Sequence, residues 1–279
     1  MQRFIQIFGK QKCKIIGMIH VDALPGTPQY AGNWEKTIEK VEHEAQLYKQ
    51  HQLDAVLIEN MHDIPYVQDR LLGPEIVACM TRLSQVVRRI LPRETPCGVQ
   101  VLACGNKHAL AVAKASQLQF IRAEGYVFGH VADEGYTNAC AGDLLRYRKQ
   151  IDAEDVLVFT DLKKKHSSHA ITQDVSLLET AHAAEFFLTD GIIITGTATG
   201  QAASSKDLQD LSGKLKVPLI IGSGVTKDNI KQYYNKAQAV IIGSHFKYNG
   251  SWQQDIDEQA VENFMHRICE LRAKKTLFT

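Results

Sequence analysis

The chain has 279 residues, of which 44% are hydrophobic and 23% are charged, and its 32 Lys and Arg residues against 31 Asp and Glu residues give a formal net charge of +1. This composition is typical of globular proteins, and the scattered basic residues argue against a nucleic-acid-binding surface. The longest apolar runs, around Ile193 and Ile241, are shorter than the roughly 18 residues that a membrane-spanning helix needs, so we expect no membrane span.

Little of the N-terminal segment precedes the first predicted strand, so we expect neither a signal peptide nor a full transit peptide. The six cysteines are widely spaced and form no Cys-x-x-Cys pair, which is typical of reduced thiols in an intracellular protein. We therefore expect a cytoplasmic protein, with an organelle matrix as the alternative.

Short apolar segments alternate with amphipathic segments along the chain. The apolar segments, which we predict to be strands, are residues 14–20, 54–59, 98–103, 120–123, 156–160, 191–195, 218–221 and 239–242. The amphipathic segments, which we predict to be helices, are residues 34–50, 74–90, 107–116, 141–150, 175–187, 205–215, 227–234 and 257–272. This alternation predicts an α/β fold, a (β/α)8 TIM barrel formed by residues 1–279 as a single domain, with an open doubly wound sheet as the alternative.

The predicted loops differ in length on the two sides of the barrel. Connections from helix to strand are short, whereas the strand-to-helix connections at residues 60–73, 124–140 and 161–172 are long. In a (β/α)8 barrel all strand-to-helix loops lie at the C-terminal face, where active sites of this fold are found. We therefore expect a functional site at that face.

Polar and charged side chains stand where the apolar strands end, and these ends meet at one mouth of a barrel. We assign Glu59 and Asp161 as general acid and base. His20 is the candidate second proton shuttle, and Arg122 is the candidate partner of an anionic intermediate. Further pocket candidates are Asp22, Asn60, Asp63, Glu124, Lys165 and His166. The alternative is that charged residues simply mark where strands meet solvent.

A divalent metal is an open alternative at the same mouth. Carboxylate and imidazole groups suit Mg, Mn or Zn, and the candidate ligands are His20, Glu59, Asp63 and Asp161. Spacing along the chain does not establish that these four groups converge, so the cofactor stays unknown at this point.

Glycine-rich turns follow the last three predicted strands, with the sequences TGTATG at 195–200, GSGV at 222–225 and GSH at 243–245. Glycine lets backbone N–H groups approach an anion closely, and barrels of this fold commonly hold a substrate phosphate in the last loops. The residues that we expect to bind the substrate and its phosphate are Gln100, Thr195, Gly196, Gly222, Ser223, Gly224, Gly243 and Ser244. The alternative is that these glycines only permit tight turns.

An ordered series of motifs resembles the BtpA/SgcQ family. The motifs are GMIH at 17–20, LPGTP at 24–28, EN at 59–60, FIR at 120–122, KH at 165–166, DGIIITGTATG at 190–200, IGSGV at 221–225 and IGS at 242–244. The resemblance implies a (β/α)8 barrel like those of the ribulose-phosphate-binding group. The family's name comes from a photosynthetic member associated with photosystem I biogenesis. This sequence departs from the family pattern at Ala123-Glu124 and at His245.

These observations lead to one functional hypothesis and one alternative. We predict an enzyme that acts on a small phosphorylated metabolite, such as a sugar phosphate or a nucleotide-derived sugar, by isomerase, lyase or hydrolase chemistry. The expected partner is that small molecule rather than nucleic acid, and a homo-oligomer is a further expectation. The alternative is a non-catalytic binding or assembly factor of the BtpA type.

Overall fold

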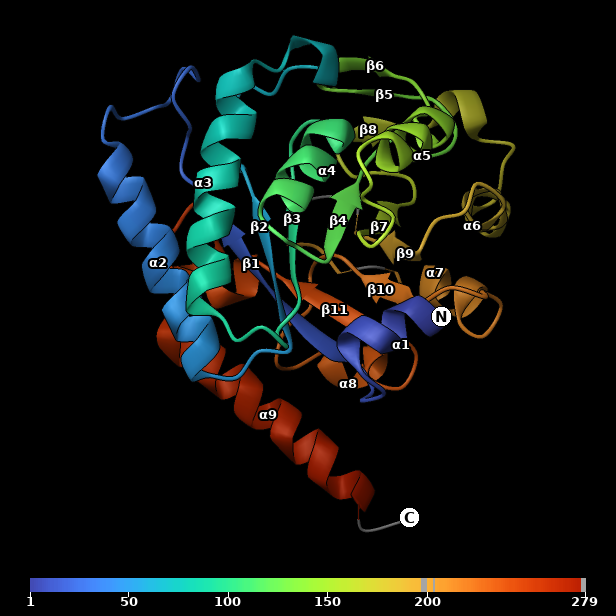
Figure 1. Ribbon diagram of the computed structural model, residues 1–279. Helices are drawn as coiled ribbons and strands as arrows, with labels where there is room; N and C mark the ends of the chain where they lie inside the picture. The colour runs from blue at the N-terminus through green and yellow to red at the C-terminus, as the bar shows by residue number, and fades with distance from the viewer. Residues whose placement is uncertain (197–199, 203, 277–279) are drawn as a thin grey trace.

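The computed structural model describes residues 1–196, 200–202 and 204–276, so Thr197, Ala198 and Thr199 of the predicted TGTATG turn lie outside the described residues. Parallel strands close into a barrel in the order β1-β11-β10-β9-β7-β4-β3-β2, which confirms the predicted (β/α)8 fold (Figure 1). The barrel strands are β1 (Lys14–His20), β2 (Ala55–Glu59), β3 (Cys97–Gln100), β4 (Phe120–Ala123), β7 (Leu157–Asp161), β9 (Gly191–Ile194), β10 (Leu219–Ile221) and β11 (Ala239–Ile242).

Helices follow the barrel strands at each step of the chain and cover the outside of the barrel (Figure 1). They are α2 (Trp34–Gln50), α3 (Pro74–Ile90), α4 (Asn106–Ala115), α5 (Ala141–Gln150), α6 (Leu177–Phe186), α7 (Ser205–Leu211), α8 (Ile230–Tyr233) and α9 (Glu258–Thr276). Local signals fix where several of them begin. Asn33 caps α2, and Ser176 forms a capping box with Glu179 at the start of α6. No helix of the described residues is long and apolar enough to cross a membrane.

The third predicted strand ends earlier than expected, at Gln100 rather than at residue 103. Beyond Gln100 the chain leaves the sheet, because the backbone N–H of Leu102 donates to the side chain of Asn60 at 2.7 Å.

A short N-terminal helix, α1 (Gln2–Phe8), was not predicted and lies across one end of the barrel (Figure 1). Phe4 and Phe8 stack with ring centroids 4.5 Å apart, and Phe8 lies 5.5 Å from Phe120 and 6.0 Å from Phe159 of the barrel interior. This aromatic cluster closes the end at which the strands begin. A ligand site inside the barrel must therefore open at the other end.

A small antiparallel sheet, also not predicted, lies at that other end (Figure 1). Its strands are β5 (His130–Ala132), β6 (Gly135–Thr137) and β8 (Ser167–Ser168), and they belong to the long loops after β4 and β7. Gln68, from the loop after β2, donates to the carbonyl oxygens of Glu134 and Tyr136 at 3.1 and 3.2 Å. Three of the long loops thus hold one another in place. The remaining short helices are η1 (Asp69–Leu71), η2 (Ala170–Thr172), η3 (Ser244–Phe246) and η4 (Tyr248–Gly250).

Candidate functional site

Strand alternation brings the predicted polar residues to one layer of the barrel. Met18, Leu57 and Phe120 belong to the barrel interior, and the residue two positions further along each strand points the same way. The pairing of β1 with β2 and of β2 with β3 sets His20, Glu59 and Gln100 side by side. The inward-facing layer above the apolar core consists of His20, Glu59, Gln100, Arg122, Asp161, Thr195, Gly222 and Gly243.

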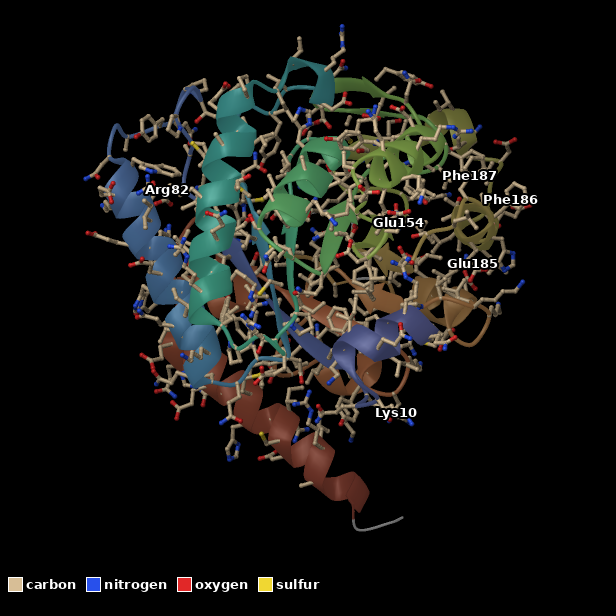
Figure 2. All side chains as sticks on the ribbon, viewed as in Figure 1. Lys10, Arg82, Glu154, Glu185, Phe186 and Phe187 are labelled. Carbon is tan, nitrogen blue, oxygen red and sulfur yellow. The ribbon has the colours of Figure 1, made fainter. Side chains whose placement is uncertain are left out.

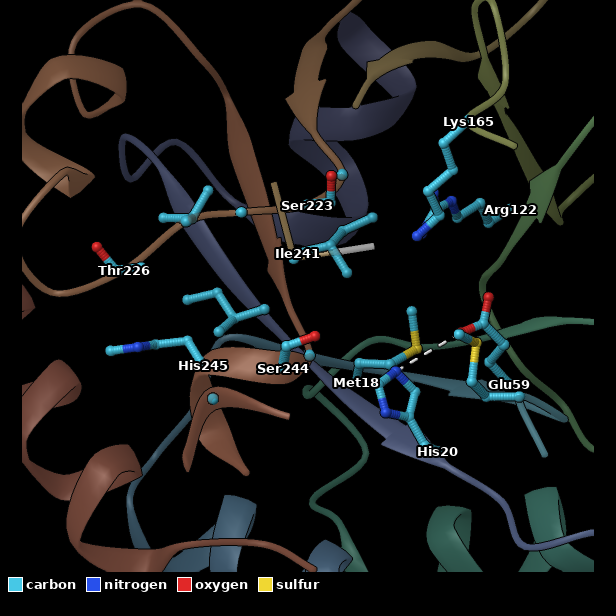
Figure 3. A pocket seen from close by; sticks show the side chains of 18 residues that line it. Met18, His20, Glu59, Arg122, Lys165, Ser223, Thr226, Ile241, Ser244 and His245 are labelled. Atoms are coloured by element: carbon cyan, nitrogen blue, oxygen red, sulfur yellow. Dashed lines mark ion pairs between the residues drawn. The ribbon is translucent and has the colours of Figure 1, made fainter. Parts of the chain in front are cut away.

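Two cavities meet at this layer. The first, of about 110 Å³, is bordered mainly by the glycine-rich turns after β10 and β11. The second, of about 390 Å³, lies toward the loops after β2, β3, β4 and β7 and is lined by several charged side chains. Both cavities are lined by Glu59, Met61, Arg122 and Lys165. Figure 3 shows Lys165 and Arg122 on one side of the first cavity, with Ser223 and Ser244 bordering it on the glycine-turn side.

Glycines form part of the wall of the first cavity, so backbone atoms border it there. Between described residues, no hydrogen bond uses the backbone N–H groups of Ser223, Gly224 or Ser244. The hydroxyl of Ser223 accepts from the N–H of Gly196 at 3.2 Å and donates to the carbonyl of Gln201 at 3.1 Å, which fixes the turn after β10 against the loop after β9. Free backbone donors in a fixed turn suit an anionic group.

Two glycines of this wall are required by close contacts. Gly224 has a φ of +68°, and a Cβ there would overlap the backbone of Gln201. A Cβ on Gly243 would lie 2.9 Å from Cε1 of His20. A side chain at either position would disturb the loop or the histidine, so the packing around these turns requires glycine there.

Arg122 and Asp161 form a buried ion pair on adjacent strands β4 and β7. Nε and Nη2 of Arg122 donate to the two carboxylate oxygens of Asp161 at 2.7 and 2.9 Å, and the two side chains are only 5% and 2% exposed. Both oxygens of Asp161 are occupied, and Asp161 lines neither cavity. The structure thus shows Asp161 engaged with Arg122 through both oxygens, and its predicted acid–base role stays a prediction.

Glu59 and His20 face each other across β1 and β2, with Nε2 of His20 3.7 Å from Oε2 of Glu59 (Figure 3). Burial raises the pKa of the Glu59 carboxyl, although Arg122 and Lys165 oppose the shift. Burial, followed by the positive charge of Lys247, lowers the pKa of His20 well below its usual value. The pKa of Glu59 is thus shifted toward neutral pH, and the pKa of His20 is shifted away from it.

Lys165 lies half-buried between the two cavities. Burial and the nearby Arg122 lower the pKa of its ammonium group, while Glu59, Asp161 and Glu124 oppose the shift. Lys165 was predicted only as a further pocket candidate, and it lines both cavities.

The other predicted residues divide into two groups. Gln100, Glu124 and His166 line the second cavity. The Oε1 atom of Gln100 is buried and has no hydrogen-bond partner among the described residues, so it is an open acceptor for a ligand. Glu124 accepts from the N–H of Cys104 at 3.2 Å and lies 3.7 Å from Nζ of Lys164.

The second group lines neither cavity and consists of Asp22, Asn60, Asp63, Thr195 and Gly196. Asp22 pairs with Lys40 on α2 at 2.6 Å. Asn60 and Asp63 are hydrogen-bonded to each other at 2.7 Å and hold neighbouring loops, because the backbone of Leu24 donates to Asp63. Asp22, Asn60 and Asp63 thus have polar atoms engaged outside the two cavities, whereas Oγ1 of Thr195 is buried and has no hydrogen-bond partner among the described residues.

Two of the four residues considered as possible metal ligands, Asp63 and Asp161, have their carboxylate oxygens engaged by other groups. Both oxygens of Asp63 accept hydrogen bonds, from Leu24 and Asn60, and both oxygens of Asp161 accept from Arg122. Within the described part of the chain, no group of three or more His, Cys, Asp and Glu side chains is arranged to hold a metal ion.

Several lining residues carried no signal in the sequence. Tyr66 and Trp252 border the second cavity from long loops, and the Trp252 ring lies edge-on to His20 with centroids 6.4 Å apart. His245 and Thr226 line the first cavity beside the glycine turns. His245 and Thr226 each stand next to a motif quoted above, whereas the loops that carry Tyr66 and Trp252 have no strand or helix periodicity.

A model of the BtpA family matches residues 11–270. A Caenorhabditis elegans protein named F13E9.13, mitochondrial, is 44% identical over 92% of this chain and 94% of its own length. The photosystem I biogenesis protein BtpA of Synechocystis is 32% identical over 95% of this chain and 91% of its own length.

Solved structures resemble this one in fold at low sequence identity. KGPDC from Streptococcus mutans superposes with a TM-score of 0.58 at 12% identity, over 93% of this chain and 99% of that one. Phosphoribosyl anthranilate isomerase from Thermus thermophilus superposes with a TM-score of 0.57 at 11% identity, over 92% and 99%. These similarities concern the barrel fold.

Proposed function

This chain belongs to the BtpA family, and from that membership and the geometry of the barrel mouth we propose that it is an enzyme acting on a small phosphorylated metabolite. The observation that carries the proposal is the junction of two cavities, one lined by free backbone donors and the other by charged side chains, at Glu59, Arg122 and Lys165. The proposed substrate is a sugar phosphate or a nucleotide-derived sugar.

In this proposal the phosphate binds to the backbone of the turns at 222–224 and 243–245. Binding energy from this remote group orients the rest of the substrate in the second cavity. Glu59 exchanges a proton with the reacting carbon or oxygen, because its raised pKa brings the carboxyl closer to neutral pH. Arg122, fixed by Asp161, stabilises negative charge that develops on the substrate. The reaction is of the isomerase, lyase or hydrolase type.

The comparisons support a phosphorylated ligand. The isomerase from Thermus thermophilus is named for a phosphoribosyl compound. The name of the Caenorhabditis elegans relative supports the organelle matrix as the location of this protein.

Thermal unfolding tests the proposal with inorganic phosphate and ribose 5-phosphate as probes and ribose as the unphosphorylated control. At a concentration 100 times Kd, binding raises the free energy of unfolding by about 2.7 kcal/mol. At roughly 2–4 °C per kcal/mol, this corresponds to an increase in Tm of about 5–11 °C. Ribose is expected to have no effect.

A variant with an added negative charge tests where the phosphate binds. Ser244→Asp adds a carboxylate beside the free backbone donors and is expected to abolish the stabilisation by phosphate. Ser205→Asp adds the same charge at an exposed position that lines neither cavity, and it is expected to keep the stabilisation. The proposal is wrong if neither phosphate probe stabilises the wild-type protein, or if Ser244→Asp responds as Ser205→Asp does.

A specific surface feature favours the assembly factor as a second candidate function. Phe186 and Leu188, at the end of α6, are 82% and 68% exposed, and Phe187 beside them is also exposed. Figure 2 shows Phe186 and Phe187 on the outer surface of the molecule. Exposed apolar patches of this kind occur at protein–protein interfaces. If this function is correct, Phe186→Ser/Leu188→Ser removes a stoichiometric protein complex that Ser244→Asp retains, as measured by light scattering after size-exclusion chromatography.

A further inference from the structure

The three consecutive lysines after β7 have three different environments. Nζ of Lys163 donates to the carbonyl of Val175 at 2.9 Å. Nζ of Lys164 pairs with Glu134 and lies 3.7 Å from Glu124. For Lys165, no hydrogen bond or ion pair between described residues involves its Nζ atom. Only the third lysine therefore presents its amine to both cavities.

The pKa values of Lys164 and Lys165 are shifted in opposite directions. Burial opposes the charge of Lys164, but the carboxylates of Glu124 and Glu134 outweigh it and raise the pKa. Burial and the positive charge of Arg122 lower the pKa of Lys165. Asp161 is already bound to Arg122 through both oxygens, so it cannot serve as a close counter-ion for Lys165. An amine that is desolvated beside a fixed cation has a larger neutral fraction, and the neutral amine is the nucleophile.

The position of Lys165 relative to the proposed phosphate site adds the geometric argument. The first cavity has the glycine turns on one side and Lys165 with Arg122 on another, above Glu59 (Figure 3). A ligand whose phosphate lies against the turns extends toward the amine. A carboxyl group with a raised pKa, Glu59, lines the same junction and can donate and accept protons.

We propose that Lys165 is a nucleophile that forms an imine with the carbonyl carbon of a phosphorylated aldehyde or ketone. The neutral amine attacks the carbonyl carbon, the C–N bond forms and the C=O π bond breaks, and Glu59 carries one proton from nitrogen to the carbonyl oxygen to give a carbinolamine. Glu59 then carries the second proton from nitrogen to the hydroxyl group, so the C–O bond breaks, water leaves and the C=N bond forms. The step consumes one amine and one carbonyl, yields one imine and one water, and needs no oxidant or reductant.

This inference rests on the proposed function and narrows it to carbonyl chemistry. An imine withdraws electrons from the adjacent carbon, which suits an isomerase or a lyase, whereas a hydrolase has no use for it. Within the substrate class proposed above, the ligands are therefore aldose and ketose phosphates in their open-chain forms.

Borohydride trapping tests the imine directly. The full-length protein is incubated with glyceraldehyde 3-phosphate, dihydroxyacetone phosphate or ribose 5-phosphate, reduced with sodium borohydride and digested, and modified lysines are identified by mass spectrometry. The expected result is a reduced adduct on Lys165 with at least one probe, suppressed by an excess of inorganic phosphate. Unphosphorylated glyceraldehyde is expected to label Lys165 much less.

Two variants control for general lysine reactivity and for folding. Lys165→Arg keeps the positive charge but cannot form an imine, and it is expected to lose the adduct while phosphate still raises its Tm. Lys163→Met removes the neighbouring lysine, which does not line the junction of the two cavities, and is expected to keep the adduct. Retention of phosphate binding by Lys165→Arg shows that the variant is folded.

The trapping and melting measurements separate the two hypotheses. If the phosphorylated probes raise Tm but none gives an adduct on Lys165, the imine is refuted and the proposed function stands. If glyceraldehyde labels Lys165 as well as glyceraldehyde 3-phosphate does and no phosphate probe raises Tm, the phosphorylated substrate is refuted, and with it the inference in this form.

Discussion

Replacing Asp161 by Asn tests whether this carboxylate holds Arg122 in a buried ion pair that stabilises the fold. The carboxylate accepts two charge-assisted hydrogen bonds, at 2.7 and 2.9 Å, from a guanidinium that is only 5% exposed. Removing one partner of such a buried pair costs about 3–5 kcal/mol. Asn retains one acceptor, so we expect a loss of about 3 kcal/mol, or roughly 6–12 °C in Tm.

Urea unfolding at pH 7 measures this loss as a lower midpoint at an unchanged dependence on denaturant. The double variant Arg122→Met/Asp161→Leu removes both charges and is expected to be more stable than Asp161→Asn, because no uncompensated charge stays buried. A loss of less than about 1 kcal/mol in Asp161→Asn, the value of an ordinary exposed pair, would refute this stabilising role.

Three further substitutions are expected to change stability in ways that follow from the environment of the replaced side chain. Glu59→Gln removes a carboxyl whose pKa is raised by burial. Wild-type stability falls as the pH rises from the ordinary value of 4.5 toward the raised pKa, so the stability advantage of Glu59→Gln grows over this window in urea titrations at a series of pH values. Phe8→Ala opens the closed end of the barrel at a cost of about 3 kcal/mol, with phosphate binding in calorimetry unchanged. Asn60→Ala leaves the buried N–H of Leu102 unpaired, so we expect a loss of about 1–3 kcal/mol and faster hydrogen exchange at Leu102.

Strand and helix periodicity was sufficient to predict the barrel, because each barrel strand is an uninterrupted buried run. It missed α1, which is a seven-residue segment that gains its stability from Phe4 and Phe8 packing into the barrel. It also missed β5, β6 and β8, because each has only two or three residues and exists through pairing with a distant loop. The hydrophobic pattern within a short segment does not predict elements that are stabilised by contacts with residues far away in the sequence.

The candidate site was predictable to the extent that strand alternation determines it. Glu59 and Arg122 point into the barrel because the apolar residues two positions earlier do so. The pairing of Arg122 with Asp161 requires β4 to lie next to β7, which the order of the strands along the chain predicts. Whether the two side chains then meet depends on their length and direction, which the sequence pattern does not give. The KH motif at 165–166 singled out Lys165 from the three consecutive lysines, but the different environments of their amines depend on loop geometry, for which the sequence has no signal.

On one side of the inward-facing layer stand charged and polar side chains, including Glu59 and Arg122, and on the other side stand Gly222 and Gly243, which have no side chain. This division constrains the chemistry. A Cβ at Gly222 would lie 3.4 Å from Nη2 of Arg122, and one at Gly243 would lie 2.9 Å from His20. The absence of side chains at these two glycines therefore leaves space next to Arg122 and His20. In the proposed function, phosphate recognition by backbone donors does not depend on side-chain identity, whereas the proposed reaction depends on Glu59 and Lys165. A BtpA-family protein that keeps the two glycine turns but replaces these two residues is therefore expected to bind the same phosphate group and to catalyse a different reaction, or none.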